Sequence, residues 1–186
     1  MLPFSAAVLA GGRSRRFGRD KARFVWRGKP LLQHVLDSLE DASERFIVAN
    51  RPYPEFGVPV VKDPFPGEGP LSGIIAALSH AAEPVVAVAA CDLPRLVPGY
   101  WVWLLERLEA APAVAVAGPS GRPEPLAAFY TKALLPLAER VLRAGERRPA
   151  ALLALAGARV LPWEAVSKRF DPALFLNANT PEDLIP

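Results

Sequence analysis

The sequence has little cysteine and no long apolar run, and both absences restrict what the protein can be. Cys91 is the only cysteine, so no intrachain disulfide can form, which is typical of a protein from a reducing compartment. No apolar run approaches the roughly 18–20 residues that a membrane span needs. Residues 1–5 also lack the positively charged start of a secretory signal peptide. We therefore expect a cytoplasmic location and no membrane association.

The sequence also has few asparagines and a small net charge. Asn50, Asn177 and Asn179 are the only asparagines, so each is a candidate for a specific role. The 22 basic and 19 acidic residues leave a net charge of +3, too small to indicate nucleic-acid binding, and we expect no nucleic-acid partner. The basic residues are nevertheless concentrated between positions 13 and 23, where only Asp20 opposes them. Such a cluster indicates either an anionic partner or a solvated surface.

Short apolar segments alternate with helical patterns along the chain, which predicts an α/β fold. The length of 186 residues suits one domain. Strands are predicted at 6–9, 46–49, 58–61, 85–90 and 113–116, and helices at 30–39, 73–82 and 100–110. The less regular second half predicts strands at 126–130 and 159–161, helices at 132–143 and 148–156, and a last helical turn capped by Thr180. This order predicts a mostly parallel sheet.

Polar residues follow several of the predicted strands. Open parallel sheets bind ligands beyond the carboxyl ends of their strands. The loop after Leu9, Asn50, Asp63 and Asp92 all follow predicted strands, within two residues of the strand end. A carboxylate at the end of the buried strand 85–90 suits Mg²⁺, which usually takes one or two carboxylates together with waters and substrate phosphates. Asp92 is therefore the candidate metal ligand.

The loop after the first strand combines glycines with basic residues. Gly11 and Gly12 allow the backbone to approach a ligand closely, and successive N–H groups can form an anion-binding concavity. Arg13, Arg16 and Lys21 can add positive charge along a triphosphate. Composition alone leaves open the alternative of a surface loop with solvated arginines.

The same loop carries a resemblance to a known family. The segment Leu9-Ala-Gly-Gly-Arg-Ser-Arg-Arg-Phe-Gly-Arg-Asp-Lys21 resembles the signature of the NTP-transferase superfamily, and its Asp20-Lys21 ending is similar to that of the molybdenum cofactor guanylyltransferases. Later segments agree in order: Gly28-Lys-Pro-Leu-Leu-Gln-His-Val35, Gly69-Pro-Leu-Ser-Gly-Ile74, Ala90-Cys-Asp-Leu-Pro94, Glu124-Pro-Leu126, Gly145-Glu-Arg-Arg148 and Phe175-Leu-Asn-Ala-Asn-Thr-Pro-Glu-Asp-Leu184. The similarity extends from about residue 6 to residue 184.

The resemblance implies a fold and a reaction. The fold would be a single-domain, Rossmann-like three-layer sandwich of the glycosyltransferase-A type, with a nucleotide-binding half at about 1–117 and an acceptor-binding half at about 118–186. The reaction would be Mg²⁺-dependent transfer of GMP from GTP to the phosphate of molybdopterin, with or without bound molybdenum. Pyrophosphate would leave, and proteins that deliver or receive the cofactor would be transient partners.

The resemblance also implies roles for individual residues. Lys21, Asp92 and Arg16 would be catalytic, and Asp92 would also hold the metal. The nucleotide would be bound by Leu9, Ala10, Gly11, Gly12, Lys21, Asn50, Asp63, Gly69, Pro70, Leu71, Gly73 and Asp92. The acceptor would be bound by Arg16, Glu124, Arg147, Arg148, Asn177 and Asn179. Two departures concern the acceptor: Glu124 stands where many relatives carry His, and Ala178 stands where a branched apolar residue is common.

Several alternatives remain open at this level. A related transferase could use CTP or another phosphorylated acceptor, and a nucleotide-binding assembly protein would have no turnover. Asp63 and Asn50 could simply form turns, and Arg147 and Arg148 could be solvated. Cys91 beside Asp92 could suggest a nucleophile, but neither histidine has a visible role as its base, so we expect a small core residue.

Overall fold

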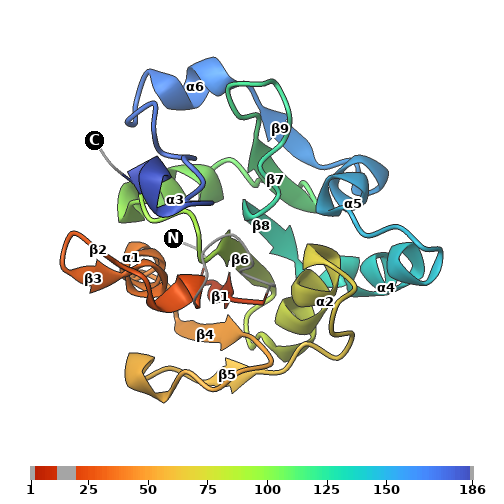
Figure 1. Ribbon diagram of the computed structural model, residues 1–186. Coiled ribbons are helices and arrows are strands. Elements are labelled where there is room, and N and C mark those ends of the chain that lie inside the picture. Colours follow the sequence, from red (N-terminus) through yellow and green to blue (C-terminus); the bar gives the residue numbers. More distant parts are fainter. Residues whose placement is uncertain (1–2, 12–19, 185–186) are drawn as a thin grey trace.

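The computed structural model describes residues 3–11 and 20–184. They form three layers, in which a seven-stranded sheet lies between two layers of helices (Figure 1). The seven strands lie in the order β5-β4-β1-β6-β8-β7-β9. They are β1 Ser5–Leu9, β4 Glu44–Val48, β5 Val60–Val61, β6 Val85–Ala90, β7 Ala113–Val116, β8 Ala127–Thr131 and β9 Arg159–Leu161. All neighbouring pairs are parallel except the two that involve β8. The predicted mostly parallel α/β fold is confirmed.

Helices cover both faces of the sheet (Figure 1). Alternate residues of each strand enter opposite layers, so Ala6 and Val8 pack on one side of β1 and Ala7 and Leu9 on the other. The first layer contains α1 Leu31–Ser38, α3 Pro98–Leu105 and α6 Trp163–Ser167. The second contains α2 Pro70–His80, α4 Leu135–Arg143 and α5 Pro149–Ala156.

Two predicted helices have different bounds in the structure. The helix predicted at 73–82 begins earlier, at Pro70, because Gly69 caps it with a φ of +84° and Pro70 suits the first helical position. The helix predicted at 100–110 ends at Leu105, and the chain then turns through Glu109, whose φ is +47°, before it enters β7. The strand predicted at 58–61 is shorter, because only Val60 and Val61 pair with β4.

Some short elements were not predicted. They are the hairpin of β2 Val25–Trp26 and β3 Lys29–Pro30, helix α6, and the single 3-10 turns η1 Lys21–Arg23 and η2 Pro54–Phe56. The helix predicted at 132–143 begins with a 3-10 turn, η3 Lys132–Leu134, which leads into α4. Segments of two to five residues are too short to show a hydrophobic period. The expected last turn is present as η4 Pro181–Leu184, and Asp183 Oδ2 accepts hydrogen bonds from Asn179 N and Thr180 N.

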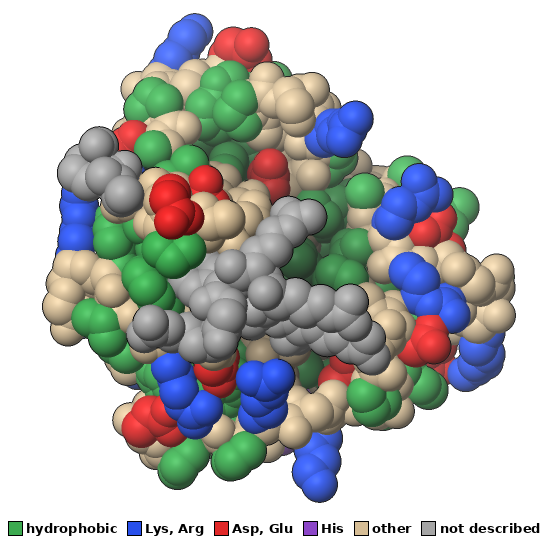
Figure 2. Space-filling model, in the orientation of Figure 1, with side chains coloured by type: hydrophobic (Ala, Val, Ile, Leu, Met, Phe, Trp, Pro, Cys, Tyr) green, Lys and Arg blue, Asp and Glu red, His purple; other side chains and the backbone are tan. Residues whose placement is uncertain are grey.

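The buried aromatic side chains serve the core. Trp101 and Trp103 are 1% and 4% exposed and pack around Tyr100, so they are packing residues. No helix among the described residues is long and apolar enough to cross a membrane. In the space-filling view the basic side chains are interspersed with acidic ones along the lower edge and right side of the molecule (Figure 2).

Candidate active site

Three neighbouring parallel strands bring the sequence-predicted residues to one edge of the sheet. Ala10 N, just beyond β1, donates to Val48 O of β4, and Cys91 N, just beyond β6, donates to Leu9 O. These hydrogen bonds hold the ends of the three strands level with one another. The loops that begin at Gly11, Asn50 and Asp92 therefore start side by side, as expected for strands that point the same way.

Lys21 and Asp92 form an ion pair at this edge. Lys21 Nζ lies 2.8 Å from Asp92 Oδ2, and the two side chains are only 14% and 21% exposed. The same ammonium donates to Asn179 Oδ1 at 3.3 Å, although 158 positions separate the two residues. Ala178 N donates to the backbone oxygen of Asp92, which fastens the C-terminal segment to the end of β6. Lys21, the end of β6 at Asp92 and the C-terminal segment at 178–179 are thus held together by direct contacts.

The other oxygen of Asp92 indicates a cation site. Asp92 Oδ1 is buried and has no hydrogen-bond partner within residues 3–11 and 20–184. A buried carboxylate oxygen without a partner is costly, so a ligand that supplies positive charge would satisfy it. No cluster of three His, Cys, Asp or Glu side chains with metal-binding spacing occurs in this described part of the chain. A single carboxylate suits Mg²⁺, which completes its shell with waters and phosphates. Asp92 therefore fits the metal role.

A glycine lies where helix α2 packs against the end of β1. A Cβ on Gly73 would lie 3.0 Å from Leu9 Cδ1, so a larger residue at this position would require the Leu9 side chain to shift slightly. Leu71 is fully buried in the same layer. Gly69 and Pro70 form the exposed start of the helix. These residues place the first turns of α2 beside Leu9, at the end of β1.

Asp63 and Asn50 lie at the ends of β5 and β4. Asp63 Oδ1 accepts from Phe65 N at 2.8 Å, and Oδ2 accepts from the Ser72 hydroxyl at 2.7 Å. The carboxylate thus forms the turn that composition suggested and also ties that turn to α2. Each of its oxygens keeps a second lone pair for a ligand. Asn50 is exposed directly after β4.

Glu124 approaches the site from the other half of the chain. Burial raises the pKa of its carboxyl, and the negative charge of Asp92 raises it further. Its carboxylate packs against the backbone of Gly118, where a Cβ would lie 2.5 Å from Glu124 Oε1. Glu124 precedes β8, the reversed strand beside β6, and this reversal puts it at the same edge as Asp92.

The remaining acceptor candidates are not all gathered around Lys21. Arg147 Nε forms an ion pair with Glu68, in the loop before α2. Arg148 pairs with Glu146 and its side chain is 80% exposed. Asn177 Nδ2 donates to Phe175 O at 3.5 Å, whereas Asn179 contacts Lys21. Gly12 and Arg16 lie outside the described residues.

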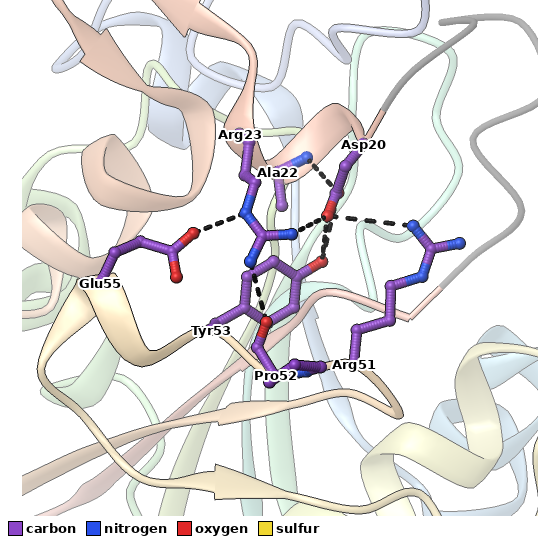
Figure 3. Close-up of polar contacts among 7 residues, drawn as sticks. All are labelled: Asp20, Ala22, Arg23, Arg51, Pro52, Tyr53 and Glu55. Carbon is purple, nitrogen blue, oxygen red and sulfur yellow. Dashed lines mark hydrogen bonds and ion pairs between the residues drawn. The ribbon is translucent and has the colours of Figure 1, made fainter.

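One group of residues escaped the sequence reasoning. Asp20, Arg23, Tyr53 and Glu55 form a hydrogen-bonded cluster beside Lys21 (Figure 3). The only signal for this cluster in the sequence was Asp20, which we considered only as part of the family motif that ends in Asp20-Lys21. Its partner Tyr53 lies 33 positions away, and no local pattern connects the two residues.

Cys91 has the environment of a core residue. Burial raises the pKa of its thiol to about 12, and the charge of Asp92 contributes in the same direction. A thiolate is the reactive species, so the thiol is inert near neutral pH. The structure supports the interpretation as a core residue.

A Cys91→Ala variant should therefore keep transfer activity within about threefold of the wild type, since only a small core group is lost. Iodoacetamide at pH 8 should label the folded wild type slowly and the denatured chain rapidly, as mass spectrometry would show. A loss of turnover comparable to that of an active-site variant would contradict this assignment.

A nucleotide-binding α/β transferase is indicated by the ends of the parallel strands, by the Lys21–Asp92 ion pair, and by Asp92 Oδ1, which has no hydrogen-bond partner among the described residues. The model of the MobA-like NTP transferase domain matches residues 6–160. A probable molybdenum cofactor guanylyltransferase of Deinococcus radiodurans is 43% identical over 152 residues, covering 80% of this chain and 78% of the relative. One from Carboxydothermus hydrogenoformans is 34% identical, covering 98% and 94%.

A solved structure agrees with the sequence relatives. Molybdopterin-guanine dinucleotide biosynthesis protein A from Archaeoglobus fulgidus superposes with a TM-score of 0.81 at 30% identity, covering 97% of this chain and 94% of the other. The chain belongs to the MobA-like NTP transferase family, and it is a nucleotidyltransferase.

Proposed function

We propose that the protein transfers GMP from GTP to the phosphate of molybdopterin, giving molybdopterin guanine dinucleotide and pyrophosphate. The observation that carries the proposal is the Lys21–Asp92 pair at the strand ends, together with the buried Asp92 Oδ1, which has no hydrogen-bond partner among the described residues. The names of the relatives support the guanylyl group and the molybdopterin acceptor.

The transfer needs positioning and charge stabilisation and no covalent enzyme intermediate. A phosphate oxygen of the acceptor attacks the α-phosphorus of GTP in line, a new P–O bond forms, and the bond to the leaving pyrophosphate breaks. Mg²⁺, when held by Asp92, would neutralise charge on the phosphate oxygens. Lys21 would release Asp92 and turn its ammonium toward the triphosphate, where developing negative charge needs a donor.

The proposed nucleotide subsite lies along β1, β4, β5 and the start of α2. The backbone of Leu9, Ala10, Gly11 and Gly12 would hold phosphates, together with the first turn of α2 at Gly69, Pro70, Leu71 and Gly73. Asp63 would accept from N1–H and N2–H₂ of guanine, since adenine offers no matching pair of donors on its Watson–Crick edge. Asn50 would add a polar contact.

The proposed acceptor subsite lies in the region of residues 118–186, and Arg16 would contribute from the first loop. Arg147 and Arg148 suit the acceptor's phosphate, because a guanidinium matches phosphate oxygens in pairs. Asn177, Asn179 and Glu124 suit polar groups of the pterin, and Asn179 reaches Lys21 directly. Transient contacts with cofactor-delivering and cofactor-receiving proteins, and a cytoplasmic location, complete the proposal.

Pyrophosphate release tests the proposal. The purified protein, Mg²⁺ and molybdopterin should release pyrophosphate with GTP, and release should fall to background when the acceptor is omitted. CTP and ATP should support rates lower by at least about tenfold, roughly the effect of one lost pair of polar contacts. Equal rates with CTP would indicate a cytidylyltransferase. Binding of GTP without turnover in the presence of molybdopterin would indicate a non-enzymatic assembly protein.

Asp63→Asn tests the base contact. The amide keeps one oxygen that can accept from Phe65 N, so the turn should persist, but it replaces one guanine acceptor by a donor. We expect the preference for GTP over ATP and CTP to fall by about tenfold while the melting temperature changes little.

Asp37→Asn is the control for that measurement. Its carboxylate likewise accepts two hydrogen bonds, from the Gln33 amide and from the Lys29 ammonium. Asp37 lies on α1, outside the proposed nucleotide subsite. It should leave the base preference unchanged. If Asp63→Asn also leaves the preference unchanged, Asp63 is only a turn residue.

A further inference from the structure

Asp20 lies at the centre of a hydrogen-bonded group that none of the roles above uses (Figure 3). Its Oδ1 accepts from Ala22 N at 3.2 Å and so caps the turn η1. The Tyr53 hydroxyl lies 3.2 Å from Oδ1 and 3.1 Å from Oδ2, and Arg23 Nη1 donates to Oδ2 at 3.0 Å. Arg51 approaches Oδ2 at 3.9 Å. The carboxylate is thus surrounded by donors.

The group joins two segments that are far apart in the sequence. Arg23 Nη2 donates to Pro52 O at 2.9 Å, and its Nε donates to Glu55 Oε1 at 2.5 Å. The guanidinium carbon also lies 4.7 Å from the centre of the Tyr53 ring. Tyr53 is only 1% exposed, so its ring anchors the segment in the core. The segment after Asn50 is therefore fastened to η1.

Lys21 is the first residue of η1, so this group controls where its backbone lies. A single 3-10 turn has little stability of its own, and its orientation depends on its cap and neighbours. In the structure the Lys21 ammonium contacts Asp92 and Asn179. During transfer it would have to exchange Asp92 for the triphosphate. A fixed backbone limits that change to the side chain.

The solvent exposure of this group indicates that it orients Lys21 more than it stabilises the fold. The Arg23–Glu55 ion pair is 43% exposed on both sides, and exposed pairs contribute little to the free energy of unfolding. The buried end of the group, the Tyr53 hydroxyl, bonds to a carboxylate immediately before Lys21. Removal of that hydroxyl takes away one donor to Asp20, the residue that caps η1, and leaves the buried ring in place. Its main effect should therefore be on the placement of Lys21.

We propose that Tyr53, Asp20 and Arg23 are positioning residues that hold Lys21 and the Asn50 segment at a fixed separation for the nucleotide. This inference rests on the proposed role of Lys21 at the triphosphate. Displacement of a reacting group by about 1 Å can reduce the rate by about 10²-fold. Loss of the network should accordingly lower kcat more than it raises the KM for GTP.

Tyr53→Phe is the most selective variant, because it removes one hydroxyl and keeps the buried ring. We expect kcat to fall about tenfold while the KM for GTP stays within about threefold. Asp20→Ala should be worse than Asp20→Asn, because the amide oxygen of asparagine can still accept from Ala22 N or from Tyr53. This order of activities, wild type above Asn above Ala, is the rescue expected of a positioning residue.

Ser38→Ala is the matched control. The Ser38 hydroxyl is likewise buried and hydrogen-bonded, to Val35 O and to Trp101 Nε1, but it lies in α1 away from the site. It should lower the melting temperature without lowering kcat of the folded enzyme. If Tyr53→Phe changes only the melting temperature, as Ser38→Ala does, the proposal is wrong.

A double-mutant cycle separates this inference from the proposed role of Lys21. If Tyr53 acts through Lys21, Tyr53→Phe should change single-turnover transfer by less than about twofold in a Lys21→Ala background. A full tenfold loss in both backgrounds would overturn the positioning role while leaving Lys21 as a phosphate ligand. Wild-type transfer by Lys21→Ala alone would instead refute the proposed role of Lys21, and the inference with it.

Discussion

Replacement of Asp92 by alanine is expected to reduce Mg²⁺-dependent release of pyrophosphate by about 10²-fold or more. The variant loses the buried Oδ1 that would face the cation and the Oδ2 that now binds Lys21. Its backbone oxygen still accepts from Ala178 N, so the tail should remain attached. Removal of an unpartnered buried oxygen relieves a cost, whereas loss of the ion pair with Lys21 adds one, so the melting temperature should change little.

Asp37→Ala is the matched control, because Asp37 also pairs with a lysine, Lys29, at 2.6 Å. It should retain normal turnover and a normal Mg²⁺ requirement. Pyrophosphate release measured across a Mg²⁺ titration, together with thermal denaturation, checks both variants. Near-wild-type turnover in the Asp92 variant would refute the metal assignment.

Lys21→Ala should lower kcat/KM for GTP by about 10²-fold, the usual cost of removing one preorganised donor from developing charge. Calorimetry should also show weaker GTP binding, because the triphosphate loses a cation. The ion pair with Asp92 disappears as well, but the fold should persist, since the cap of η1 comes from Asp20.

Lys29→Ala provides the control for charge alone. Lys29 forms the corresponding pair with Asp37, and its side chain is 56% exposed on the β2–β3 hairpin. Both variants lower the net charge equally, so a general electrostatic effect on GTP would appear in each. Normal binding and turnover by Lys21→Ala would show that the glycine loop has another triphosphate ligand.

The central part of the fold could be predicted because its signals are local. Strands β6 and β7 have the predicted bounds, since each is an apolar run that begins directly after a proline, Pro84 or Pro112. The start of α2 was predicted three residues too late, although Pro70 is a local signal for the first helical position. The position of Gly73 inside the helix, against the Leu9 side chain, depends on packing between elements, which the local pattern does not contain.

The candidate site was predictable to the same extent. Lys21 and Asp92 follow strands, so their shared location could be predicted from the direction of those strands. The contact between Lys21 and Asn179 and the bonds from Tyr53 to Asp20 depend on how distant segments return to the edge. The resemblance grouped Asn177 and Asn179 as acceptor-binding residues, whereas their described contacts are with Phe175 and Lys21.

The strand order has a consequence for how the enzyme can move. Strand β7, from the region proposed to bind nucleotide, lies between β8 and β9 of the region proposed to bind the acceptor. Hydrogen bonds on both sides of β7 interleave the two regions, so a hinge between them would have to break the sheet. Closure over two substrates must therefore come from loops and side chains, and small-angle scattering should detect no domain rotation when both substrates bind.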